Sequence, residues 1–106
     1  MSVRLVLSTC PDADTAARLA RALVDERLAA CVSALPGAVS TYRWQGQVEQ
    51  SSEVQLLIKT SGERLDALTA RLAELHPYEL PEILAVEAGG LPAYLAWVVD
   101  QTHEEP

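Results

Sequence analysis

The chain has 106 residues, of which 49% are hydrophobic, and its formal net charge is −7. This length suits one domain, and the apolar content argues against disorder. So acidic a surface is repelled by phosphate backbones and anionic lipids, which disfavours nucleic acid and membranes as partners. The sequence predicts no signal peptide and no membrane span, so we expect residues 1–106 to form a single cytoplasmic domain.

The first 28 residues predict a strand followed by a helix. Residues 3–9 are mostly β-branched and aliphatic, which indicates a buried strand. Apolar side chains then recur at helical spacing over residues 16–28, and Asp12 or Asp14 can serve as the N-cap.

Residues 30–60 predict a long β-hairpin. Its first strand runs from 30 to 44 and is interrupted at Pro36-Gly37, where a bulge or kink is expected. A turn is predicted at 45–47, with Gly46 supplying the positive φ. Residues 48–60 form the return strand.

The second half of the chain predicts another helix, a short strand and a last helix. Ser61 is the expected cap of a helix with a leucine stripe over residues 65–75. A short strand is predicted at 83–87 and a short helix at 92–99. The polar tail, residues 100–106, is expected to fray.

The element order is therefore β-α-β-β-α-β with an extra C-terminal helix. This order is typical of the split βαβ, ferredoxin-like fold of the α+β class. Two helices are expected to cover one face of an antiparallel four-stranded sheet.

The length of the hairpin predicts an oligomer. Its return arm of 14 residues, 47–60, would span about 45 Å if extended, whereas a compact domain of this size is roughly 35 Å across. The predicted tip carries Tyr42, Trp44 and Val48, which would be poorly placed in water beside open strand edges. We expect neighbouring subunits to pair with and cover it, in a closed cyclic oligomer.

Five segments together resemble the divalent-cation tolerance (CutA) family, in the same order and at the same spacing over nearly the whole chain. They are Ser8-Thr9-Cys10-Pro11-Asp12, Leu28-Ala29-Ala30-Cys31-Val32, the hairpin motifs STYRWQG (40–46) with 53–55 and 58–60, HPYELPEI (76–83), and Tyr94-Leu95-Ala96-Trp97.

The resemblance implies a homotrimer of ferredoxin-like subunits, similar to the PII signalling proteins, with the long hairpins joining neighbours. It also implies a role in tolerance to divalent metals, copper above all, through binding rather than catalysis. An alternative is a PII-like sensor or adaptor whose clefts between subunits bind a small ligand, with no essential metal. An enzyme using Lys59 and carboxylates at an interface is the least favoured reading, because the usual enzyme motifs are missing from the sequence.

His76 and Cys10 are the candidate metal ligands. His76 follows a helix end, where an imidazole can be exposed and can bind copper or zinc. Cys10 precedes a helix N-terminus, which would lower the pKa of its thiol and favour Cu(I). Some family members carry a thiol at the position of Ser8 and a second histidine at that of Leu75. A capping or solvent-facing histidine and an idle thiol are the alternative readings.

Lys59, Glu82, Tyr78 and Glu53 are the candidate residues of a cleft between subunits that binds a small anion or a metal. The alternative is that Lys59 forms structural ion pairs between subunits. Two further sets are assigned structural roles: Tyr42 and Trp44 as interface anchors, and Cys31 as a packed, reduced thiol.

Overall fold

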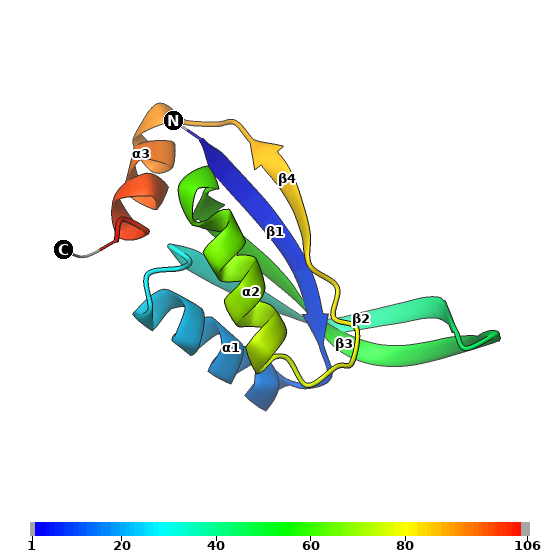
Figure 1. The fold of residues 1–106 in the computed structure, drawn as a ribbon. Coiled ribbons are helices and arrows are strands. Elements are labelled where there is room, and N and C mark those ends of the chain that lie inside the picture. Colours follow the sequence, from blue (N-terminus) through cyan, green and yellow to red (C-terminus); the bar gives the residue numbers. More distant parts are fainter. Residues whose placement is uncertain (1, 105–106) are drawn as a thin grey trace.

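In the computed structural model, which describes residues 2–104, four antiparallel strands form one sheet in the order β2-β3-β1-β4 (Figure 1). The strands are β1 (Val3–Cys10), β2 (Cys31–Trp44), β3 (Gln47–Ser61) and β4 (Leu84–Ala88). The helices among the described residues are α1 (Ala13–Asp25), α2 (Leu65–Leu75) and α3 (Pro92–Gln101), with a 3₁₀ turn over Gly62–Arg64. This is the ferredoxin-like order, so the predicted α+β fold is confirmed.

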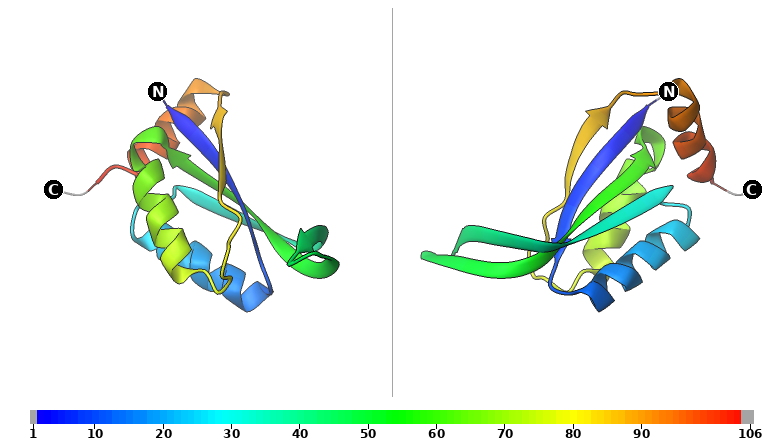
Figure 2. Two further views of the ribbon diagram at one scale, coloured as in Figure 1. Left: turned by 45° about the vertical axis from the view of Figure 1, so that its right-hand side comes forward. Right: turned by 180° about the vertical axis from the view of Figure 1, so that it is seen from behind.

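Helices α1 and α2 lie side by side on one face of the sheet (Figure 2). The Asp12 side chain accepts a 2.8 Å hydrogen bond from the Thr15 amide and so caps α1, as one of the two predicted caps. The core between the layers is aliphatic, and its fully buried side chains include Val6, Leu19, Leu23, Leu56, Ile58, Leu68 and Leu72.

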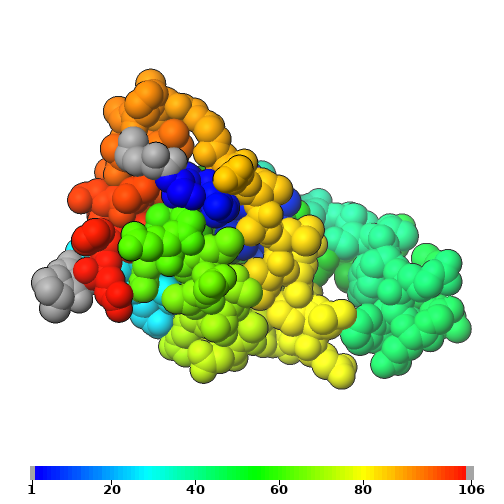
Figure 3. Space-filling model, turned by 45° about the horizontal axis from the view of Figure 1, so that its top comes forward, coloured from blue at the N-terminus to red at the C-terminus, as the bar shows by residue number. Residues whose placement is uncertain are grey.

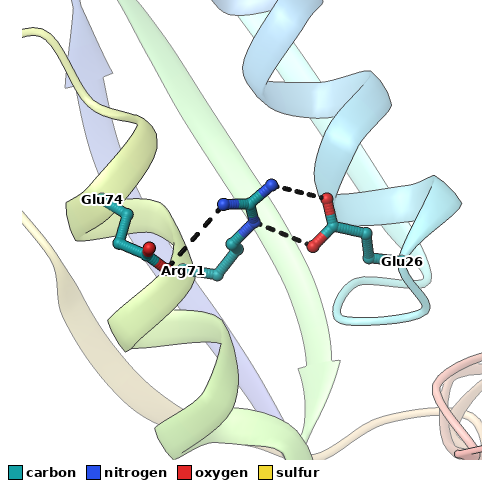
Figure 4. Close-up of polar contacts among 3 residues, drawn as sticks. All are labelled: Glu26, Arg71 and Glu74. Carbon is teal, nitrogen blue, oxygen red and sulfur yellow. Dashed lines mark hydrogen bonds and ion pairs between the residues drawn. The ribbon is translucent and has the colours of Figure 1, made fainter.

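An ion pair joins the C-terminal end of α1 to the middle of α2 (Figure 4). The Arg71 guanidinium on α2 donates to both carboxylate oxygens of Glu26, the residue that ends α1, at 2.9 and 3.1 Å. Glu74 lies 3.8 Å from the same guanidinium. These side chains are partly exposed on the solvent side of the two helices, and none of them lines the groove described below.

The C-terminal tail differs from the prediction. Helix α3 continues to Gln101, and Thr102 is only 1% exposed. The Thr102 hydroxyl lies 3.0 Å from the Ser61 hydroxyl and 2.9 Å from the Val98 carbonyl oxygen. The prediction of a frayed tail is therefore wrong for residues 100–102, and residues 105–106 lie outside the described part of the chain.

The same contact corrects the expected role of Ser61. Its side chain makes no capping hydrogen bond, and the 3₁₀ turn separates it from α2. The buried hydroxyl instead meets Thr102, 41 residues later in the chain. A tertiary partner has replaced the local capping role that the sequence pattern suggested.

The hairpin of β2 and β3 projects beyond the rest of the molecule (Figures 1 and 2), and the longest dimension is 45 Å. Its register shifts between Leu35 and Ala38, which confirms the bulge at Pro36-Gly37. Gln45 and Gly46 both have positive φ, as a two-residue hairpin turn of type I′ requires. The described residues contain no helix of the length and apolarity that a membrane crossing demands.

The sheet face opposite α1 and α2 lacks a covering layer in the described chain (Figure 2), and it carries both polar and exposed apolar side chains. Leu35, Leu84 and Val86 point to this face by their register, and they are 45%, 58% and 49% exposed. Val39 and Val48 on the projecting arm are more exposed still. We call the uncovered face that carries Leu35, Leu84 and Val86 the open sheet face.

Candidate binding groove

A groove of about 840 Å³ lies between the hairpin and the segment that connects α2 to β4. Figure 3 shows the hairpin standing apart from the yellow segment near residue 80, with a hollow between them. One wall is formed by Ser40, Thr41, Tyr42, Trp44 and Glu53 of the hairpin, with Thr9 at its base. The other is formed by residues 77–82. We call this feature the hairpin groove.

The bulge in β2 determines which hairpin side chains reach the hairpin groove. Beyond the bulge, Ser40 and Tyr42 fall in the same alternation as Ala38, which pairs with Glu53. Because side chains alternate across a strand, Ser40, Tyr42 and Glu53 share one face. That face is continuous with the open sheet face.

The opposite wall is shaped by its prolines. Pro77 follows the last helical residues of α2 and cannot continue the helix, and Pro81 keeps the segment extended before β4 begins. The segment carries the carboxylates of Glu79 and Glu82, both exposed, into the lining of the hairpin groove.

Tyr78 and Glu53 join the two walls. The Tyr78 hydroxyl donates a 2.6 Å hydrogen bond to Oε2 of Glu53, which is 8% exposed. Burial by itself would raise the pKa of Glu53, but hydrogen bonds with Ser40, Tyr78 and Thr9 outweigh it and hold that pKa below its ordinary value. Burial and the adjacent carboxylate raise the pKa of Tyr78, so it remains a donor.

His76 is buried, with 7% of its surface exposed, contrary to the expected exposed ligand. Its Nε2 lies 2.7 Å from the Thr9 carbonyl oxygen, and its Nδ1 accepts a 3.1 Å hydrogen bond from the Tyr78 amide. The imidazole also packs against the Tyr78 ring, with centroids 4.7 Å apart. Both nitrogens are therefore used inside the protein, and His76 positions Tyr78.

Cys10 is fully buried on the helix-covered face of the sheet. Burial raises the pKa of its thiol, and the contact with the Asp12 backbone only partly offsets that effect. The predicted lowering of this pKa is therefore wrong, because desolvation outweighs the helix N-terminus. Ser8 lies on the same face, and its Oγ is buried without a hydrogen-bond partner.

The predicted polar set is split within one chain. Glu53, Tyr78 and Glu82 meet in the hairpin groove, whereas Lys59 is six residues further along β3, on the order of 20 Å away. The Lys59 ammonium donates to the Ser33 hydroxyl at 3.1 Å and lies 3.9 Å from the Cys31 sulfur. Cys10 and Cys31 are both free thiols, as predicted.

The sequence pattern does not identify several residues of the hairpin groove, among them Thr9, Ser40 and Glu79. Tyr42 and Trp44, the predicted interface anchors, also line the groove within one chain. Glu79 adjoins Tyr78 in the motif HPYELPE, so its neighbour offered a signal. Thr9 and Ser40 offered none, because their place depends on tertiary contacts.

No group of three or more His, Cys, Asp and Glu side chains in residues 2–104 is arranged to share a metal ion. His76 and Cys10 do not fit a resident copper site in this conformation. The imidazole has no free lone pair directed outward, and the buried thiol is held protonated.

Comparison with known proteins identifies relatives over nearly the whole chain. A family model described as CutA1 divalent ion tolerance protein matches residues 4–101. A divalent-cation tolerance protein CutA from Pectobacterium atrosepticum is 48% identical over 95 residues, which are 89% of this chain and 86% of that protein.

Solved structures agree with this relationship. The crystal structure of CutA from Xylella fastidiosa is 54% identical and superposes with a TM-score of 0.94, covering 97% of this chain and all of that one. A protein from Archaeoglobus fulgidus, described as a periplasmic divalent cation tolerance protein CutA, is 28% identical with a TM-score of 0.91, over 95% of this chain and 99% of that one.

Proposed function

The chain belongs to the CutA1 divalent ion tolerance protein family, and we propose that it acts in tolerance to divalent cations as a cytoplasmic, non-catalytic homotrimer. The acidic net charge of −7 supports attraction of cations over anions. Because a relative is described as periplasmic, the cytoplasmic location proposed for this chain needs an experimental test. Fractionation of cells that make the protein tests the cytoplasmic assignment.

The open sheet face is the observation that supports assembly. Leu35, Leu84 and Val86 together leave an apolar surface beside two strand edges, β2 and β4. Such a surface favours burial against further copies of the chain. The projecting hairpin supplies a second contact region, since Val39 and Val48 are about two-thirds exposed.

Copper or another divalent cation is the proposed ligand, and it is proposed to bind the assembled trimer. A metal ion needs several donors at once, and one chain offers no group of three among the described residues. Donors from two subunits would meet this requirement. The exposed carboxylates of Glu79 and Glu82 are the first candidates from each chain.

Isothermal titration with Cu(II), Zn(II) and, under reductant, Cu(I) tests this proposal on the untagged protein. The variants are Glu79→Gln/Glu82→Gln and His76→Ala/Cys10→Ser. We expect stoichiometric copper binding that the first pair removes and the second pair retains. Loss only in the second pair would return the ligand role to His76 and Cys10. Weak binding without defined stoichiometry, equal for both metals, would overturn metal binding as the function.

A PII-like sensor or adaptor is the second candidate, and the size of the hairpin groove favours it. About 840 Å³ is within the range of pockets that hold small organic molecules. Its aromatic side chains, Tyr42, Trp44 and Tyr78, also suit an organic ligand more than a bare ion.

A further inference from the structure

We propose that the hairpin groove is a binding site for a compact organic cation, either a protonated amine or a quaternary ammonium ion. This inference goes beyond the tolerance function and does not depend on metal binding. It differs from the anion that the presence of Lys59 suggested, because Lys59 does not line the groove of its own chain.

The charge of the lining selects a cation. Glu53, Glu79 and Glu82 contribute three carboxyl groups, and none of the described residues that line the groove is Lys, Arg or His. Arg43 lies on the same hairpin, but it alternates with Tyr42 and Trp44 and so points to the other face of the strand. The network around Glu53 keeps that carboxylate ionised at neutral pH.

The aromatic side chains select an organic cation. Tyr42 and Trp44 stand on the same face of β2, two residues apart, and Tyr78 faces them from the other wall. Aromatic faces attract ammonium groups through the ring quadrupole, most strongly where water is excluded. A bare divalent ion gains less here, because it needs clustered oxygen or nitrogen donors and the described residues provide no such group.

Part of the groove is held in place before any ligand arrives. His76 fixes Tyr78 through its amide, and Glu53 fixes the Tyr78 hydroxyl at 2.6 Å. The prolines at 77 and 81 restrict the backbone of the same wall. Rigid walls reduce the ordering cost of binding, so a small cation can be held by few contacts.

The experiment uses the intact oligomer in EDTA and compares choline with 3,3-dimethylbutanol, its neutral analogue of the same shape. The chain has two tryptophans, so Trp97→Phe leaves Trp44 as the single fluorescent reporter in the groove. We expect choline to change Trp44 fluorescence with saturation, and the neutral analogue to bind at least about tenfold more weakly. Calorimetry on the unmodified chain provides a second readout.

Glu79→Gln/Glu82→Gln should weaken choline binding by about tenfold, while Glu63→Gln, an exposed carboxylate on the 3₁₀ turn outside the lining, should leave it unchanged. Equal binding of choline and its neutral analogue, an equal effect of Glu63→Gln, or no binding by either readout would overturn the proposal. Because EDTA removes metal ions, this result and the copper titration can fail separately.

Discussion

The hydroxyl of Tyr78 donates a 2.6 Å hydrogen bond to the carboxylate of Glu53, and it thereby connects the segment after α2 to the middle of β3. Each partner maintains the protonation state that the other needs: the tyrosine stays protonated and the glutamate stays ionised. His76 holds the backbone of Tyr78 in place, because its Nδ1 accepts a hydrogen bond from the Tyr78 amide. One wall of the hairpin groove is therefore fixed to the other by hydrogen bonds.

Tyr78→Phe should lower the free energy of unfolding by about 1.5 to 3 kcal/mol, the usual range for a hydrogen bond to a charged group. The phenyl ring keeps its packing against His76, so the loss reports the hydroxyl. Denaturant unfolding at fixed protein concentration measures it. Tyr94→Phe on the exposed α3 is the matched control. Equal effects of the two changes would show that the hydrogen bond contributes little.

The free energy of unfolding should fall on acidification, in part because Glu53 becomes protonated. Its pKa is lower in the folded chain than its ordinary value of 4.5, so its contribution is present above pH 4.5 and is lost as the pH falls through the folded value. In Glu53→Gln the unfolding free energy should decline less steeply below pH 4.5, with a difference of at most about 1.4 kcal/mol per pH unit. Denaturant midpoints over a pH series test this. Identical slopes would contradict it.

His76 should carry its proton on Nε2 at neutral pH. Its Nδ1 accepts the Tyr78 amide hydrogen, so Nε2 is left to donate to the Thr9 carbonyl oxygen, 2.7 Å away. Long-range ¹H–¹⁵N spectra distinguish the two tautomers directly. The exposed His103 supplies an internal comparison in the same spectrum. A proton on Nδ1 would contradict both hydrogen bonds of the imidazole, because Nδ1 could not accept from Tyr78 and Nε2 could not donate to Thr9.

The fold was predictable because each element has its own periodicity. Three features are local properties of the sequence: the apolar spacing of α1 and α2, the alternation in the strands and the turn at Gly46. The resulting order of strands and helices is typical of the ferredoxin-like fold. The Pro36-Gly37 bulge was predictable for the same reason, since both residues disrupt a regular strand.

The site was less predictable because its contacts join distant parts of the chain. His76 contacts the carbonyl oxygen of Thr9, 67 residues earlier in the chain, and no spacing pattern in the sequence predicts that contact. The position of Cys10 beside a helix start suggested a lowered pKa, but its complete burial reverses the direction. Lys59 and Glu53 share a face of β3, yet their separation along the strand keeps them apart within one chain.

Ser8→Ala should leave stability unchanged or raise it by about 1 kcal/mol. The Ser8 hydroxyl is fully buried and has no partner in the structure, so its removal relieves a desolvation cost. Thr60→Val is the contrasting variant, because the buried Thr60 hydroxyl donates a 2.6 Å hydrogen bond to the Leu28 carbonyl oxygen and its loss should destabilise. Denaturant unfolding compares the two. A clear loss of stability in Ser8→Ala would show that its hydroxyl has a bound partner, such as water.

Val86→Glu should weaken assembly, because it places a charge on the open sheet face beside the free edge of β4. Val24→Glu is the matched control: Val24 lies on α1, on the other side of the sheet, and is 41% exposed against 49% for Val86. Light scattering at micromolar concentration should show an oligomer for the parent chain and the control, and a smaller species for Val86→Glu.

Assembly through the open sheet face also predicts that stability depends on protein concentration. In the parent chain the unfolding midpoint should rise with concentration, because association stabilises only the folded subunit. In Val86→Glu the dependence should weaken or vanish, while Val24→Glu should retain it. A parent chain that scatters as a monomer, with a midpoint unmoved by dilution, would exclude the homotrimer and with it a metal site completed by two subunits.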